Sequence, residues 1–509
     1  MFIKKRLLLV FLIVIVALSY GFSSFAAEKQ ELIIAFGTEI VTFDMHNYRG
    51  TMDIIAGRPV YEALVDFGKD HNIVPCLATS WNQIDTLTWD FKLREGVKFH
   101  DGTTFNADAV KINFERKKDS GSTASVSFVD EIEIIDDYTI RFHLNKEYGP
   151  ILNCFALGTA IIVSPSYLEN TSKEEIGNHA VGTGPFILQE FSPGIRTVYV
   201  KNQDYWGEPA KLDRIEIRAI PEDGTRVMAL RSGEVDVIEN PSPNDIPSIE
   251  RDKNLYVYQS PKDRTLFIGF NLTDEIVGGD EEKSKAIREA IAFAINKKEI
   301  VDYVLEGLGY VADTGFIPQT MSQGFHDPDL ERDFDVEKAK AILKEAGIEE
   351  GTGIEFTVTR ARYLKDTAIA EVIQQQVGNI GLKLKINVMD YGPFVNYVQG
   401  LESQMFQQGY GWPAGEPHEV LFDLFHSEGA RNRLAFYNEE FDNLIDTAVE
   451  TVDLKERMGL YNQAYKILFD KVGVIPLLHY QNIFAANNKV KDFYAAPGEQ
   501  IYFEGIYIE

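Results

Sequence analysis

The chain has 509 residues, more than one ordinary hydrophobic core accommodates, so two or three domains are expected. Its composition, 45% hydrophobic and 25% charged, excludes a largely disordered or a collagen-like chain. With 50 Lys and Arg against 78 Asp and Glu, the formal net charge of −28 argues against nucleic acid as a partner. Two cysteines are too few for a disulfide scaffold or a cysteine-based zinc or iron–sulfur site.

The first 26 residues have the pattern of a secretory signal peptide. Residues 4–6 are Lys-Lys-Arg, residues 7–18 are apolar, and small residues at Ser24 and Ala26 precede Ala27. The apolar run is shorter than the roughly 18 to 20 residues that span a membrane. We therefore expect cleavage before Ala27 and export of an acidic mature chain to the periplasm, without a cysteine near the cleavage site for lipid attachment.

The next segments predict a region of mixed helices and strands. Residues 88–94 alternate apolar and polar side chains, as a half-buried strand does. Asn106 is a candidate N-cap for a helix with Ala107, Val110 and Phe114 on one face. Residues 131–144 read as two strands around an Asp-Asp turn.

Cys76 and Cys154 both lie in the exported part of the chain. An oxidising compartment would allow a disulfide between them. Two separate buried thiols are the alternative, and the sequence leaves both open.

Residues 351–412 predict a β-α-β-α-β unit. The expected strands are 354–359, 382–388 and 405–410, and the expected helices are 366–380 and 393–401. This order implies parallel strands joined by right-handed crossovers.

Ligands of such sheets bind beyond the carboxyl ends of the strands. Polar and aromatic side chains follow each of the three strands here, so we predict a ligand site at this edge of the sheet. Ordinary surface loops are the alternative for any single residue. The candidates are Arg360, Arg362, Tyr363, Asp390, Tyr391, Tyr410 and Trp412.

Catalytic motifs are missing from the sequence. It contains no G-x-S-x-G elbow, no phosphate-binding loop and no dinucleotide fingerprint. His418-Glu419 has no second histidine at metalloprotease spacing, and His100-Asp101 lies in a strand–turn context that favours a structural role. We therefore expect no catalytic residue, no metal and no cofactor. A secreted hydrolase such as a glycosidase remains the alternative.

Five segments, in this order, resemble a known family. They are Pro-Cys-Leu-Ala-Thr-Ser-Trp at 75–81, the run from Phe91 to Gly102, Val-Gly-Thr-Gly-Pro-Phe at 181–186, Asn-Gln-Asp-Tyr-Trp at 202–206 and Ala-Leu-Arg-Ser-Gly-Glu-Val-Asp at 229–236. Together they resemble the extracellular solute-binding protein family 5 of ABC importers, the dipeptide, oligopeptide and nickel receptor group. The resemblance runs from about Glu31 to the C-terminus.

The resemblance implies a two-lobed α/β periplasmic-binding-protein fold of type II, a clamshell with an extra inserted α+β domain. Strands are expected to cross between the lobes at 267–271 and 476–480. The implied divisions are signal peptide 1–26, lobe I at 27–58, 181–266 and 485–509, the inserted domain at 59–180, and lobe II at 267–484.

The resemblance also implies that Arg360, ten residues before Ala370-Glu371, holds a ligand carboxylate, as in the family's dipeptide receptors. The amine-binding Asp of those receptors is absent after Trp412, and whether Glu416 replaces it stays open. Phe43, Tyr391, Tyr410 and Trp412 could instead form an aromatic platform for an oligosaccharide, and His418 is the candidate for a nickel complex. The full set of expected ligand-binding residues is Arg360, Arg362, Tyr363, Trp412, Tyr410, Tyr391, Glu416, Phe43, Phe270 and Asn271.

The function implied is that of a monomeric receptor. It would capture a small solute, a short peptide or peptide-like molecule, and deliver it to a membrane ABC permease with its ATPase. The alternatives are an oligosaccharide or nickel complex as the solute, and a peptide-binding chaperone or signalling receptor on the same fold.

Overall fold

The computed structural model describes most of the chain from residue 29 onward. The expected signal peptide and Trp412 lie outside the described residues. The described ranges are 29–47, 50–69, 72–120, 126–173, 175–279, 281–312, 315–318, 330, 332–360, 362–411, 415–498 and 500–509.

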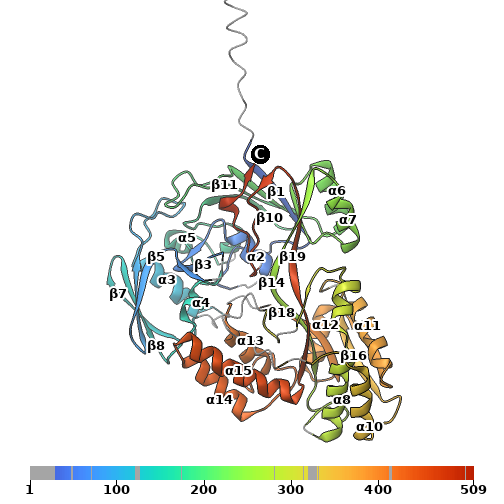
Figure 1. Ribbon diagram of the computed structural model, residues 1–509. Helices are drawn as coiled ribbons and strands as arrows, with labels where there is room; N and C mark the ends of the chain where they lie inside the picture. The colour runs from blue at the N-terminus through green and yellow to red at the C-terminus, as the bar shows by residue number, and fades with distance from the viewer. Residues whose placement is uncertain are drawn as a thin grey trace, which may run out of the picture.

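One sheet runs through both lobes of the molecule (Figure 1). Its lobe I strands, in spatial order, are β10 (Phe186–Ser192), β11 (Arg196–Lys201), β12 (Arg214–Ala219), β1 (Glu31–Phe36) and β13 (Val237–Glu239). The sheet continues through β19 (Val474–Asn487) and β14 (Leu255–Phe270) to the lobe II strands β18 (Met405–Gly411), β16 (Gly353–Thr359) and β17 (Lys383–Met389). The short strand β15 (Tyr310–Val311) pairs with β19. The lobe I helices are α2 (Thr51–Gly57), α6 (Asp223–Ser232) and α7 (Ile246–Glu250).

The long antiparallel pair β14 and β19 joins the two lobes. Residues 255–261 of β14 pair with 481–487, and residues 265–269 pair with 474–479. The register shifts between Pro261 and Thr265. Proline has no backbone N–H to donate to a ladder, so an irregularity is expected beside it. This shift lies a few residues before the 267–271 segment where the sequence predicts the first crossing.

The predicted β-α-β-α-β unit is confirmed in lobe II. Strand β16 pairs in parallel with β17 and β18, and α11 (Asp366–Gly378) and α12 (Tyr391–Gln399) provide the crossovers. Helix α11 buries Ile369, Ile373 and Val377, as its spacing predicts. The remaining lobe II helices are α8 (Glu282–Ala294), α9 (Lys297–Glu299), α10 (Val336–Glu345), α13 (Pro417–Phe425), α14 (Glu439–Glu450) and α15 (Leu454–Lys471).

The inserted segment has its own sheet and its own hydrophobic core. The sheet order is β5 (Ala78–Asp85), β6 (Thr88–Leu93), β8 (Thr139–Leu144) and β7 (Val129–Asp136), with α3 (Ala107–Lys118) packed against it. Asn106 caps α3 as predicted, since its Oδ1 accepts from the backbone N of Ala109 at 3.1 Å. The shorter elements are β2 (Glu62–Ala63), β3 (Val65–Phe67), β4 (Ile73–Pro75), β9 (Ile161–Ile162), α4 (Ile151–Phe155) and α5 (Pro165–Asn170), with β20 (Val490–Lys491) and β21 (Tyr507–Ile508) near the C-terminus.

The two cysteines are free and buried. The thiol of Cys76 lies 3.8 Å from Glu62 Oε1, and that of Cys154 lies 3.7 Å from the Tyr148 hydroxyl. Of the two interpretations left open by the sequence, the structure therefore has the separate thiols. Among the described residues, no helix has the length and apolar character needed to span a bilayer.

The inserted domain sits directly on lobe II as well as on lobe I. In Figure 1, α13, α14 and α15 (orange to red) lie beneath it. The backbone N of Gly149 donates to Val449 O at 2.7 Å, and Val449 packs into the core of the inserted domain. A Cβ on Gly149 would lie well inside van der Waals contact with the backbone of Thr451. This contact therefore requires glycine at position 149.

We expect Gly149→Ala to separate the inserted domain from the turn between α14 and α15. Overpacking against backbone should cost about 1–3 kcal/mol, and small-angle scattering should give a larger radius of gyration. Gly459→Ala is the matched control, because Gly459 lies in α15 and a Cβ added there would meet no atom within 4 Å. The free energy of unfolding of Gly459→Ala should rise by about 0.5–1 kcal/mol. Equal free energies of unfolding for the two variants, measured with urea, would contradict the close contact at Gly149.

Candidate ligand-binding site

A cavity of about 850 Å³ lies between the two lobes, beside the β14–β19 pair. This volume is in the range of roughly 300–1,000 Å³ that small-molecule sites occupy. Lobe I contributes α2, the start of α6 and the loop 239–243, and lobe II contributes the loop 360–368. Lys262, Arg264, Tyr480, Gln481 and Ile483 line it from the joining strands. The predicted edge of the lobe II sheet therefore faces a cavity.

Arg360 and Arg362 both line this cavity. The backbone N of Arg360 donates to Met389 O at 2.8 Å, which holds the residue at the end of the β16–β17 ladder. Its side chain is 66% exposed, and Nε lies 3.3 Å from Asp390 Oδ1. The Arg362 guanidinium carbon lies 4.9 Å from the centre of the Tyr391 ring. The structure thus brings together the residues that follow the first two strands.

Asp366 organises the loop that carries these arginines. Its Oδ2 accepts from Thr359 Oγ1 at 2.8 Å and from the backbone N of Arg362 and Tyr363 at 3.0 and 3.2 Å. Lys365 takes a left-handed conformation at φ +57° to bring the chain into α11. Because three donors share one buried carboxylate oxygen, Thr359, Arg362 and Tyr363 are held in place beside the start of α11.

Tyr363 anchors the same loop to the neighbouring strand. Its hydroxyl donates to Gly409 O at 2.9 Å, and its ring stacks on Tyr480 with centroids 6.5 Å apart and planes at 17°. Burial raises the pKa of the Tyr363 hydroxyl, so it is a neutral donor at physiological pH. Tyr363 lines the cavity, and its expected contact with ligand stays a prediction.

Arg226 builds the opposite wall in lobe I. It is 5% exposed, and its guanidinium donates to four backbone carbonyls. These belong to Ile220 and Pro221 at 2.7 Å each, and to Glu239 and Asn240 at 3.1 Å each. Burial lowers the pKa of this guanidinium. The bonds hold the start of α6, with Glu222 and Asp223, beside the loop after β13, so this wall presents carboxylates.

Tyr391 and Tyr410 lie at the strand ends but outside the cavity lining. Tyr391 is 40% exposed and stacks on Phe394. The Tyr410 hydroxyl donates to Asp423 Oδ2 at 2.8 Å and accepts from Arg431 at 2.7 Å. Tyr391 contacts the cavity lining through Arg362, whereas the partners of the Tyr410 hydroxyl lie outside the lining.

The structure places Phe43, Phe270 and Asn271 in the lobes rather than in the cavity. Phe43 is 1% exposed, with its ring edge-on to Phe191 in the lobe I core. Phe270 is 0% exposed in the lobe II core. The Asn271 amide donates to Leu401 O at 2.8 Å, and its Oδ1 accepts from Thr273. Packing and turn formation account for all three residues.

Glu416 is also buried in the interior, outside the cavity lining. It is 3% exposed, and its carboxylate accepts from Arg457 Nε at 3.0 Å and Nη2 at 3.4 Å. Arg457 further donates to the carbonyls of Thr451 and Val452, so the ion pair ties the entry of α13 to α15. His418 lies one residue into α13 and outside the cavity lining, and burial lowers its pKa to about 3. Among described residues, no group of three or more His, Cys, Asp or Glu could hold a metal ion.

Sequence reasoning missed the charged and polar residues of the joining strands. Lys262 and Arg264 are two residues apart and share a strand face, directly before the apolar run 266–270. That pattern was visible in the sequence. Gln481 on β19 carried no local signal, since only the pairing of distant strands brings it to the cavity.

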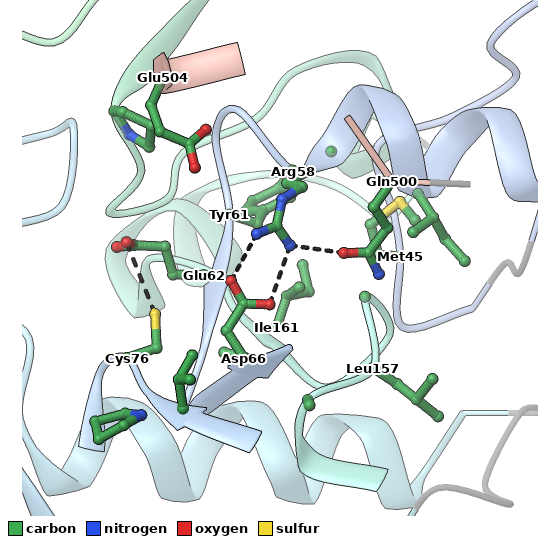
Figure 2. A pocket seen from close by; sticks show the side chains of 18 of the residues that line it. Met45, Arg58, Tyr61, Glu62, Asp66, Cys76, Leu157, Ile161, Gln500 and Glu504 are labelled. Carbon is green, nitrogen blue, oxygen red and sulfur yellow. Dashed lines mark hydrogen bonds and ion pairs between the residues drawn. The ribbon is translucent and has the colours of Figure 1, made fainter. Parts of the chain in front are cut away.

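A second, smaller cavity of about 210 Å³ lies where the inserted segment leaves lobe I (Figure 2). The Arg58 guanidinium binds Asp66 through contacts of 2.6 and 3.0 Å and donates to Gln500 Oε1 at 2.7 Å. Nearby, Glu62 accepts from Thr183, Tyr205 and Trp206 at 2.6, 2.8 and 2.8 Å. These bonds join three distant stretches of chain, which indicates a structural junction.

The geometry is that of a protein that encloses a small solute between two lobes. The sequence profile described as "Bacterial extracellular solute-binding proteins, family 5 Middle" matches residues 72–432, and the chain belongs to this family. It is 30% identical over 500 residues to the glutathione-binding protein GsiB of Escherichia coli O1:K1 / APEC, covering 95% of each chain. It is 29% identical over 493 residues to the dipeptide-binding protein of Escherichia coli (strain K12), covering 90% of this chain and 91% of that protein.

A solved structure gives the same result for the fold. The periplasmic binding protein DppA from Helicobacter pylori, in complex with the peptide STSA, matches with a TM-score of 0.77 and 28% identity, covering 94% of this chain and 98% of that one. The expected family and the expected type II periplasmic-binding-protein fold are therefore confirmed.

We predict that Glu62 makes the stability of the protein fall as pH rises. Burial raises the pKa of Glu62 from its ordinary value of 4.5 to about 7. Between these values the folded protein keeps a proton that the unfolded chain has released, so unfolding becomes easier with rising pH and the effect is complete above pH 7. The loss should reach at most about 3 kcal/mol. Unfolding of wild type and Glu62→Gln at pH 5 to 8 isolates it, because the amide does not titrate. If the free energies of unfolding of the two proteins change with pH in the same way, the raised pKa of Glu62 is contradicted.

We predict that Glu416→Gln destabilises the protein by about 3–5 kcal/mol, because Arg457 is left as a buried charge without its carboxylate. The double variant Glu416→Gln/Arg457→Met should recover part of this loss. Thermal unfolding measures both. A fully stable Glu416→Gln protein that loses affinity for its ligand would instead place Glu416 in the ligand site.

Proposed function

We propose that this protein captures a short peptide or peptide-like solute between its lobes and delivers it to a membrane ABC permease with its ATPase. The observation that carries this proposal is the position of Arg360 at the carboxyl end of β16, facing the inter-lobe cavity. The relatives named for dipeptide and glutathione binding, and the fold match solved with a bound peptide, support a peptide-like ligand.

In the proposed complex the ligand carboxylate binds the Arg360 guanidinium. The planar fork of arginine matches a carboxylate with two parallel hydrogen bonds. The ion pair that Arg360 makes with Asp390 is no obstacle, because the two side chains are 66% and 77% exposed. Exposed pairs of this kind are worth about 0–1 kcal/mol, so a ligand carboxylate in the closed cleft can replace Asp390.

Closure of the cleft follows from the way the strands join the lobes. We infer that the lobes, with the boundaries implied by the family, rotate about the register shift between Pro261 and Thr265. A ligand that contacts loop 360–368 and the α6 wall together favours the closed state, since only that state offers both sets of contacts. The proposed cycle is binding and release, with no covalent step.

The setting of this cycle belongs to the same proposal. Cleavage before Ala27 would release a monomer outside the cytoplasm, where it would meet the permease. The family of extracellular solute-binding proteins supports this location.

The test is substitution of the two arginines on one loop. With a di- or tripeptide that binds wild type, Arg360→Ala should lose roughly 2–5 kcal/mol of binding, about 30-fold to several thousandfold. Arg360→Lys should recover only part of it, because an ammonium lacks the fork. Arg362→Ala tests the second arginine that lines the cavity from the same loop, and titration calorimetry measures all three variants. Unchanged affinity in both alanine variants would refute a carboxylate clamp here and favour an uncharged ligand such as a sugar.

A further inference from the structure

Five of the cationic side chains that line the cavity lie on one wall, opposite Arg226. Five cationic side chains line it from β14 and from the loop after β16: Lys262, Arg264, Arg360, Arg362 and Lys365. On that side Asp366 accepts from the loop donors that shape the turn, and Asp390 pairs with Arg360 at 3.3 Å. The whole chain has a net charge of −28, so this concentration of positive charge is local to the cavity. A wall on which one sign of charge predominates favours a ligand group of the opposite sign beside it.

The cations form two groups that start from different strands of the sheet. Arg360 and Arg362 follow β16, whereas Lys262 and Arg264 belong to β14, and β18 lies between these strands in the sheet. Neighbouring strands are about 4.8 Å apart, so the two groups start from backbones separated by about 10 Å. Arg264 lies over Gly411, where an added Cβ would be 3.4 Å from its Nη2. Its charge is therefore held on the β18 side of β14.

Gln481 adds a directional polar group on the next strand. The residue is 8% exposed, lines the cavity, and its Oε1 is buried without a hydrogen-bond partner. A buried acceptor without a donor is costly, so a ligand N–H that bonds to Oε1 as the cleft closes would relieve that cost. Strand β13 follows β19 in the sheet and brings Glu239 to the cavity. From β16 to β13 the wall thus changes from cationic to hydrogen-bond accepting to anionic.

We propose that the ligand has a second carboxylate, bound by Lys262 and Arg264, and an N–H group that donates to Gln481 Oε1. This inference rests on the proposed function, in which Arg360 binds the first carboxylate. The ligand class is an acidic short peptide or peptide-like amide, with its carboxylates toward β16 and β14 and its nitrogen toward β19 and β13. An extended peptide rises about 3.4 Å per residue, so a tripeptide with an acidic N-terminal side chain spans the two cationic groups.

Two tripeptides of nearly equal shape test the second carboxylate. By titration calorimetry at low ionic strength, wild type should bind Glu-Ala-Ala at least about tenfold more tightly than Gln-Ala-Ala. Raising the salt concentration should reduce this ratio, since screening weakens the extra charge pair. Lys262→Met/Arg264→Met should bring the ratio close to one, mainly by weakening Glu-Ala-Ala. Lys253→Met is the matched control, because Lys253 is exposed outside the cavity and should leave the ratio unchanged.

A further variant tests the acceptor separately. Gln481→Met keeps the length of the side chain and removes Oε1. It should weaken both tripeptides by about fivefold or more while keeping the ratio between them. A variant that binds both peptides as well as wild type does would overturn the role of Gln481.

The outcomes of these measurements distinguish the second carboxylate site from the proposed peptide-receptor function. Equal affinity of wild type for the two tripeptides overturns the second carboxylate site and leaves the peptide receptor standing. If neither of them nor Ala-Ala-Ala binds, the peptide receptor itself is overturned, and the inference falls with it. The wild-type ratio and its salt dependence decide the question even if the double variant fails to fold.

Discussion

The β14–β19 ladder is the constraint on which the rest of the structure depends. These two antiparallel strands lie inside one sheet that begins in lobe I and ends in lobe II. Their side chains are almost entirely buried on the lobe II side, which makes the ladder a rigid connection there. The shift between Pro261 and Thr265 interrupts it beside the cavity. The same interruption places Lys262 and Arg264 at the cavity, so the connection between the lobes and the proposed recognition of ligand share one short segment.

The site combines fixed anchors with groups left open for ligand. Asp366 and the Tyr363 hydroxyl use their hydrogen bonds on the protein itself and fix the loop after β16. Arg226 does the same for the lobe I wall through four carbonyls. The groups proposed to bind ligand are of another kind: Arg360 is largely exposed, and Gln481 Oε1 has no partner. Because these hydrogen bonds within the protein fix the walls of the cavity, the groups proposed to bind ligand are preorganised, which reduces the entropy lost on binding.

Local patterns predicted the elements, and tertiary packing decided the site. The β-α-β-α-β unit was predictable because its apolar spacing is local, and parallel topology then placed Arg360 and Arg362 at the sheet edge. Glu416 could not be assigned from sequence, since its partner Arg457 lies 41 residues away. Gln481 reaches the cavity through a partner strand more than 200 residues distant. The role of a residue that depends on such long-range pairings cannot be predicted from the residues next to it in the sequence.

The contrast between an acidic protein and a cationic wall fits capture of an anion at short range. At physiological ionic strength the Debye length is about 8 Å, so most of the chain's surplus of carboxylates is screened from a ligand inside the cavity. The groups that line the cavity lie within that distance, and among them the cations of β14 and of the loop after β16 dominate one wall. Closure removes water and strengthens these nearby interactions further. An acidic exterior, which favours solubility, is therefore compatible with the proposed selection of negatively charged solutes in the cleft.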